Sequence, residues 1–286
     1  MDYTKPVVDI IPTRSSMRTY TPTPIEPEKL QFLQDAMAES TTGPFGGQAR
    51  FVWVELDAVD PVEVRQLGTY GFIKGAKYFI IGVKLASPMD LEDFGYCFER
   101  IILLATDLGL GTVWLGGTFK RAEFAKQAHL VANESVPAIS PVGYATDKRR
   151  LVERVGRRVI KATQRKPWAS LYFDGDFATP LAEPTAGSYA TALEMVRLGP
   201  SAGNGQPWRV VKDARNNSFH FYVQRKGKPG GDVQLPQFTR LDIGIAICHF
   251  DLVTREAGLD GEWVVNDPQI TPLPPNTRYE ASWVEK

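Results

Sequence analysis

A turn-prone stretch, rich in small and amide side chains, is the most informative part of the sequence for the fold: Gly199-Pro200-Ser201-Ala202-Gly203-Asn204-Gly205-Gln206-Pro207-Trp208-Arg209. Apolar residues at helical spacing precede it and a β-branched run follows it, so it should connect a helix to a strand. Its glycines let a backbone approach a ligand closely, and its serine and amide side chains can hydrogen-bond along the edge of a flat heterocycle. An ordinary polar turn would have the same composition, so both interpretations stay open.

The composition limits the classes of protein that the chain can represent. The chain has 286 residues, enough for one large domain or two of ordinary size. Its 33 Lys and Arg balance its 33 Asp and Glu, so no overall positive field would attract nucleic acid or an anionic membrane. No apolar run approaches the roughly 20 residues of a membrane span, and the N-terminus lacks the apolar core of a signal peptide. We therefore expect a soluble cytoplasmic protein with neither nucleic-acid nor membrane partners.

The cysteines and histidines form no pattern typical of a metal or redox site. Cys97 and Cys248 lie in helical patterns without a CxxC motif or a Cys/His cluster, so we expect core residues and no bound metal. His129, His220 and His249 show no catalytic spacing and are expected to be structural or surface residues. No protein side chain is therefore predicted to act as a catalyst.

Two basic segments could bind an anion. Two arginines and a serine alternate at Arg14, Ser16 and Arg18, and the planar guanidinium group suits phosphate oxygens. A solvated helix start would show the same pattern. The run 148–166 contains nine Lys or Arg residues, which is typical of a solvated helix face, although its first residues could meet a phosphate.

The hydrophobic pattern predicts a mixture of helices and strands. Helical spacing is found at 27–38, from 90 to 109, and before residue 199, and strands are predicted at 51–54, 78–83, 111–115, 139–144 and from 209. The pair Gly116 and Gly117 follows one of these strands, either as a plain turn or as backbone close to a ligand. Aromatics, prolines and glycines occur without a period at 167–187, which predicts an ordered connector.

The second half of the sequence repeats the first. Asp93-Phe94-Gly95 and Asp242-Ile243-Gly244 lie 149 positions apart, and the same offset relates Gly109-Leu110 to Gly258-Leu259 and Trp114 to Trp263. The dipeptide Gly-Gln recurs at 47 and 205, an offset of 158. We therefore predict two tandem repeats, residues 1–158 and 159–286, packed within one chain as a pseudo-dimer.

Each repeat keeps a polar motif that the other lacks. The loop at 42–46 has neither the serine nor the asparagine of 200–204, and Phe45 could fill the space. In the second repeat, the sequence match to the alternating arginine motif is Arg165, Pro167 and Ala169.

Three motifs occur in order: R-x-S-x-R near the N-terminus, G-L-G-x-x-W-L-G-G after a long helix, and P-S-x-x-N-x-Q-P-W-R before a strand. Together with the duplication they resemble the FMN-dependent nitroreductase family, most closely its fused single-chain branch, and the resemblance spans nearly the whole chain. It implies an α+β fold, a mixed sheet flanked by helices. In that family flavin lies between two subunits, which here would be the two repeats.

The resemblance also implies cofactor-binding roles in both repeats. The FMN phosphate and ribityl side would be held by Arg14, Ser16 and Arg18 and by Lys148 and Arg150 of a K-x-R. The pair Gly116 and Gly117 would lie near flavin N5, and Lys74 would approach the pyrimidine edge. The ring itself would be held by the second-repeat loop, through Pro200, Ser201, Asn204 and Gln206.

The implied activity is hydride transfer from NAD(P)H to flavin N5 and then to a small-molecule acceptor, such as a nitroaromatic or a quinone. The flavin supplies the chemistry and the protein holds the ring. Two alternatives stay open: a specialised reaction on the same fold, such as reductive dehalogenation, and a flavin-binding protein without turnover. Because only one complete set of motifs is present, we expect one FMN per chain and a monomer.

Overall fold

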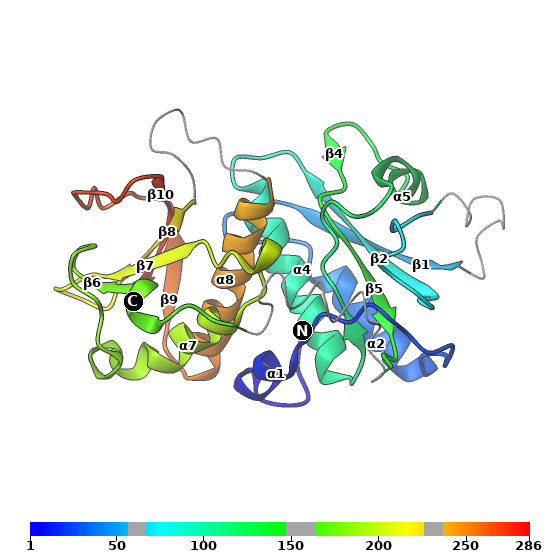
Figure 1. The fold of residues 1–286 in the computed structure, drawn as a ribbon, viewed down its shortest axis with the longest axis horizontal. Helices are drawn as coiled ribbons and strands as arrows, with labels where there is room; N and C mark the ends of the chain where they lie inside the picture. Colours follow the sequence, from blue (N-terminus) through cyan, green and yellow to red (C-terminus); the bar gives the residue numbers. More distant parts are fainter. Residues whose placement is uncertain (57–66, 147–163, 226–236) are drawn as a thin grey trace. The chain divides into compact units, whose positions relative to one another are not determined.

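The computed structural model describes residues 1–56, 67–146, 164–225 and 237–286, and the chain forms two compact units, Met1–Ile160 and Lys161–Lys286. Each unit contains one sheet and several helices (Figure 1). The junction between the units falls outside the described residues, so the predicted division after residue 158 stays a prediction.

The sheet of the first unit has the strand order β1-β2-β5-β3, with β4 paired to β2. All of these pairs are antiparallel. The strands are β1 (Ala49–Glu55), β2 (Tyr78–Leu85), β3 (Gly111–Thr112), β4 (Glu134–Ser135) and β5 (Ile139–Gly143). The helices are α1 (Val7–Thr13), α2 (Pro27–Glu39), α4 (Asp90–Asp107) and α5 (Arg121–Gln127).

Strand β2 and helix α4 form the centre of this unit. The first six residues of β2 are buried, as its continuous apolar run predicted. Helix α4 packs on β2 so closely that a Cβ at Gly82 would collide with the ring of Phe94. Most residues of α4 are buried, which explains why its apolar positions extend almost all round the helix.

The sheet of the second unit has the order β6-β7-β8-β10-β9, and among these described strands only the β6–β7 pair is parallel. The strands are β6 (Tyr172–Asp174), β7 (Trp208–Lys212), β8 (Phe219–Gln224), β9 (Gly261–Val264) and β10 (Thr277–Glu285). The helices are α7 (Ala190–Leu198) and α8 (Gln237–Glu256), with short 3-10 helices η2 (Trp168–Ser170), η3 (Glu183–Tyr189) and η4 (Ala202–Asn204). The predicted connector 167–187 therefore contains a strand that its lack of period concealed.

The sheets of the two units share one strand order, which is consistent with the predicted duplication. The order β1-β2-β5-β3 corresponds to β7-β8-β10-β9, and β6 is an additional edge strand of the second unit. The long helices end in the same way, at Gly109 with φ 78° and Gly258 with φ 71°. After each glycine, the next amide donates to a carbonyl five residues earlier, at 2.8 Å and 2.9 Å. Glycine adopts this left-handed backbone without a steric penalty.

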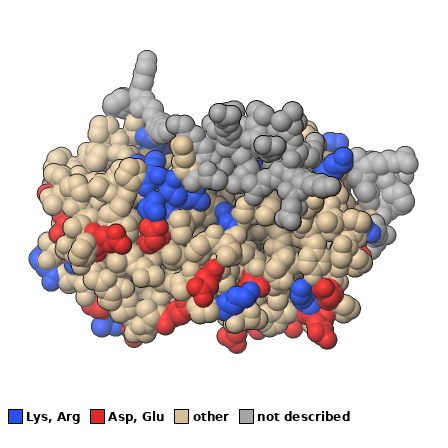
Figure 2. Space-filling model, turned by 60° about the horizontal axis from the view of Figure 1, so that its bottom comes forward, with Lys and Arg blue, Asp and Glu red and all other residues tan. Residues whose placement is uncertain are grey.

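The surface and the cysteines agree with the sequence. On the face shown in Figure 2, basic and acidic side chains occur in small groups of both signs, in keeping with equal numbers of each. Within the described ranges, no helix combines the length and the apolar character needed to cross a bilayer. Cys97 and Cys248 are buried free thiols, as predicted.

Candidate functional site

The R-x-S-x-R motif follows α1 and lies between β3 and the turn that carries Lys74. Ser16 forms a bridge with Thr112 of β3, and Thr19 forms one with Lys74. The Lys74 amide also donates to the carbonyl of Arg18 at 3.0 Å. The backbone of the first unit therefore brings together the predicted phosphate-binding motif and the predicted lysine, which are more than 50 residues apart in the sequence.

Arg14 is an unusual cation within this group. The residue as a whole is half-buried, but its Nη1 is shielded from solvent and has no hydrogen-bond partner among the described residues. Burial lowers the pKa of the guanidinium, and the nearby Glu99 opposes that shift. A shielded N–H donor without an acceptor is costly, and an anionic group at this place would satisfy it.

Two more cations belong to the same backbone arrangement. Arg18 is half-buried and Lys74 is exposed, and neither side chain makes a hydrogen bond or ion pair with the residues that the structure describes. The segment also lies beside the end of β5, since the Thr21 amide donates to the carbonyl of Tyr144 at 2.8 Å. The chain continues from there toward Lys148 and Arg150, but both predicted phosphate ligands lie outside the described residues.

The glycine pair begins a bend after β3. Leu115 forms a bridge with Ile139 of β5, so the backbone just before the glycines is fixed to the sheet. The carbonyl of Gly116 accepts a hydrogen bond from Arg121 Nη2 at 2.6 Å, which ties the bend to the start of α5. Gly117 is exposed. The bend is therefore held at both ends.

In the second unit, the loop at 199–206 connects α7 to β7, as predicted. Its own groups close it: the Gln206 amide donates to Ser201 Oγ at 2.9 Å. Asp242, on α8, accepts from the Ala202 amide at 2.9 Å, and burial raises the pKa of this carboxyl well above its ordinary value. Asn204 and Gln206 have positive φ angles of 55° and 45°.

A neighbouring segment that the sequence analysis did not assign to the site contacts this loop. The amide of Asn204 donates from Nδ2 to the Gln164 carbonyl at 2.8 Å and accepts at Oδ1 from Arg165 Nη1 at 3.2 Å. Gln206 Oε1 accepts from the backbone N–H of Lys166 at 2.7 Å. No sequence signal marked these contacts, because they join residues about 40 positions apart through a segment without a recognisable motif.

These contacts correct the predicted match of Arg165, Pro167 and Ala169 to the arginine motif of the first repeat. The strand that follows them, β6, pairs with β7, which corresponds to β1. The R-x-S-x-R motif instead lies beside β3, which corresponds to β9. Since β1 and β3 form opposite edges of their sheet, the two segments are not equivalent, and the match is wrong.

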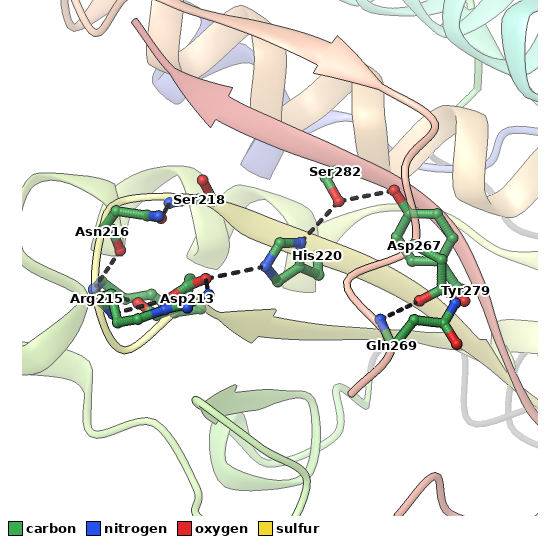
Figure 3. A network of polar contacts seen from close by, with 10 residues as sticks. Asp213, Arg215, Asn216, Ser218, His220, Asp267, Gln269, Tyr279 and Ser282 are labelled. Carbon is green, nitrogen blue, oxygen red and sulfur yellow. Dashed lines mark hydrogen bonds and ion pairs between the residues drawn. The ribbon is translucent and has the colours of Figure 1, made fainter. Parts of the chain in front are cut away.

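The buried histidine of β8 does not form a hydrolytic triad. His220 Nδ1 lies 2.8 Å from Ser282 Oγ, and its Nε2 lies 3.9 Å from Asp213 Oδ2 (Figure 3). Ser282 Oγ also lies 2.8 Å from the hydroxyl of Tyr279. A catalytic serine bonds to Nε2 while the acid orients Nδ1, which is the reverse of this arrangement. Burial lowers the pKa of His220, so the group is a neutral polar contact within the sheet.

Comparisons with known proteins agree with this fold. The family model described as "Putative TM nitroreductase" matches residues 6–254. Among solved structures, a "putative nitroreductase" from Thermotoga maritima is similar, with 17% identity, a TM-score of 0.59, and coverage of 99% of this chain and 95% of that chain.

Shorter chains match about half of this one. A nitroreductase family protein from Clostridium difficile has 19% identity and a TM-score of 0.41, with 55% of this chain and 92% of that chain covered. A protein from Desulfovibrio desulfuricans described as a "putative nitroreductase in complex with fmn" has 24% identity and a TM-score of 0.40, with 52% of this chain and 95% of that chain covered. No curated protein matches the chain. Since the family model extends over most of the sequence, the chain belongs to the nitroreductase family that it describes.

Proposed function

We propose that the protein is an FMN-dependent NAD(P)H oxidoreductase that reduces nitroaromatic, quinone or related acceptors. Membership of the nitroreductase family supports this, as does the FMN in the Desulfovibrio desulfuricans relative. The observation that carries the proposal is the shielded Nη1 of Arg14, which has no acceptor among the described residues. An FMN phosphate would supply that acceptor as well as a compensating charge.

The residues of the first unit are suited to this anion. Arg14, Arg18 and Lys74 would contribute positive charge, and the hydroxyl of Ser16 would add a hydrogen bond. Lys148 and Arg150 are proposed to complete the phosphate site. The backbone bridges to β3 and to the Lys74 turn fix the motif before any ligand binds, so little conformational entropy is lost on binding.

The loop of the second unit is proposed to orient the ring. This loop is shaped by Pro200, Ser201, Asn204 and Gln206. The first unit is proposed to contribute Gly116 and Gly117, which would approach flavin N5. When bound, FMN would supply the hydride chemistry, accepting from NADH or NADPH and donating to the acceptor. The protein would supply only binding and orientation, so no residue is proposed as an acid, base or nucleophile.

The same proposal includes the organisation of the protein. The two repeats are proposed to form the pseudo-dimer within one chain, and the protein is proposed to act as a cytoplasmic monomer, where NAD(P)H is available. The repeated strand order of the two units supports the pseudo-dimer.

The test begins with the purified protein. We expect a flavin absorbance spectrum, FMN as the flavin released on denaturation, bleaching by NADH or NADPH under nitrogen, and recovery of colour with a nitroaromatic or a quinone. A protein that binds no flavin, or mainly FAD, contradicts the proposal. Flavin that neither nucleotide reduces would favour the non-catalytic alternative, and reduced flavin that neither acceptor reoxidises would favour the specialised reaction.

A further inference from the structure

The two amide side chains of the second-unit loop are occupied by contacts within their own unit. Asn204 Oδ1 accepts from Arg165 Nη1 and from Gln206 Nε2, both at 3.2 Å, while its Nδ2 donates to the Gln164 carbonyl at 2.8 Å. Gln206 Oε1 accepts from the Lys166 amide at 2.7 Å. Gln206 is also buried, at 3% exposed. These side chains therefore serve the shape of the loop.

Lysine and arginine side chains hold the loop backbone as well. The carbonyl of Gln206 accepts from Lys166 Nζ at 2.8 Å and from Arg209 Nη1 at 3.2 Å. Arg165 Nη2 donates to the carbonyl of Leu198, the last residue of α7, at 3.0 Å. One guanidinium group thus joins the end of the helix to Asn204, across the start of the loop.

The backbone of the loop requires such support. Gly203, Asn204 and Gln206 have φ angles of 57°, 55° and 45°. Asparagine tolerates the left-handed region better than most residues, but glutamine has no such advantage. Strained conformations of this kind persist where surrounding contacts over-determine them, and they concentrate at ligand sites.

We propose that Arg165 and Lys166 are positioning residues that clamp the loop 199–206 in the conformation that receives the flavin ring. In this arrangement Gln206 acts through the loop and not as a direct ring ligand. The proposal rests on the proposed function, because it concerns the same loop. The proposal also gives Arg165 a structural role in its own unit, in place of its sequence match to the arginine motif of the first repeat.

The first test compares Arg165→Met and Lys166→Met with the parent. Each variant keeps an unbranched apolar side chain and removes the charged N–H donors. We expect FMN binding to weaken by about ten- to a hundredfold, measured by flavin fluorescence quenching, because a charge-assisted hydrogen bond to the loop is lost. Arg255→Met is the matched control, since Arg255 is exposed and paired with Asp251 on α8; it should leave the affinity unchanged.

Hydrogen exchange gives a readout that does not need flavin. In the flavin-free protein, the amides of residues 201–206 should exchange faster in both methionine variants than in the parent, while those of β7 and β8 stay protected. Arg165→Lys, which keeps the charge and one donor toward Asn204, should recover part of both the protection and the affinity. If Arg165→Met fails to fold, the exchange rates and FMN affinities of Arg165→Lys and Lys166→Met test the clamp instead.

A double-mutant cycle tests whether Arg165 acts through Asn204. If it does, Arg165→Met combined with Asn204→Ala should weaken FMN binding by less than the product of the two single effects. Fully multiplicative effects, or unchanged loop exchange in both methionine variants, would overturn the clamp. If the parent itself binds no FMN, the proposed function fails, and the exchange comparison alone then supports or refutes the clamp.

Discussion

Arg14→Met should stabilise the flavin-free protein and weaken its binding of FMN. The side chain of Arg14 places one donor, Nη1, in a shielded position without an acceptor among the described residues, and burial lowers the pKa of the guanidinium. Without ligand, the folded state therefore carries a penalty for this charge. Methionine keeps the volume and removes the donor.

The two effects can be estimated separately. A buried donor left unsatisfied costs about 1–3 kcal/mol, so the flavin-free variant should be more stable by up to this amount, less the lost attraction to Glu99. Removing one charge-assisted phosphate contact should weaken FMN about ten- to a hundredfold. At an FMN concentration of about 100 times the parent Kd, binding stabilises the parent by about 2.7 kcal/mol but the variant by only about 0.4–1.4 kcal/mol.

Urea unfolding with and without FMN measures both quantities in one experiment. Arg18→Met is the control. Arg18 belongs to the same motif, but none of its side-chain nitrogens is a buried donor without a hydrogen-bond partner. It should weaken FMN without stabilising the flavin-free protein. If Arg14→Met destabilises the flavin-free protein and leaves the FMN-linked stabilisation intact, Arg14 is a structural residue and the phosphate assignment is wrong.

Asp93, Gly82 and the flavin stoichiometry can each be tested by a separate measurement. Burial raises the pKa of Asp93 to about 6, so the folded protein keeps a proton that the unfolded chain releases from about pH 4 upward. Relative to Asp93→Asn, the parent should lose about 3 kcal/mol of unfolding free energy as the pH rises from about 3 to about 7, and parallel urea-derived stability curves would contradict this. Gly82→Ala should destabilise the protein by about 1–3 kcal/mol, because its Cβ would collide with the ring of Phe94; an unchanged urea midpoint would mean that the ring moves aside. Finally, flavin absorbance per mole of protein and light scattering should give one FMN per monomeric chain, and two flavins or an obligate dimer would refute the pseudo-dimer.

The sequence was informative where one local pattern determines one element. The apolar run from Tyr78 became the buried strand β2, and the residue spacing after Asp90 became α4. The offset of 149 correctly related two helix ends, because a left-handed glycine after a helix leaves a recognisable residue at a fixed place. The fold class followed from these elements and from the three motifs.

The rest depended on contacts between distant residues. Strand β6 has only three residues and is stabilised by pairing with β7, so no period marks it. Arg165 resembled a remnant of the arginine motif because sequence comparison gives only order, whereas the sheet shows to which edge each segment belongs. The shielding of Arg14 Nη1 was equally invisible, since burial of one atom depends on everything packed around it.

The loops at 42–47 and 199–206 occupy corresponding places in the two units, but side chains of opposite charge hold them. In the first unit, Asp93 accepts from the amides of Phe45 and Gly47 at 2.9 Å and 2.6 Å. A Cβ at Gly43 or at Gly47 would collide with this carboxyl group, so a side chain at either position is excluded while Asp93 holds the loop. Ser201 of the second-unit loop is aligned with Gly43. A serine at position 43 would collide with Asp93, which gives a steric reason why the first loop has glycine there.

The same contrast bears on the proposal of one flavin site per chain. In the second unit the corresponding acid, Asp242, accepts from the Ala202 amide, and the cationic side chains of Arg165 and Lys166 also hold the loop. A loop held by cations favours an electron-rich ligand, whereas a loop closed around a carboxylate disfavours one. We therefore expect that restoring serine and asparagine to the first loop would not by itself create a second flavin site. Asp93 would also have to be replaced, and residues 159–286 would still lack an R-x-S-x-R motif, so part of the asymmetry of the two repeats lies in how each loop is held.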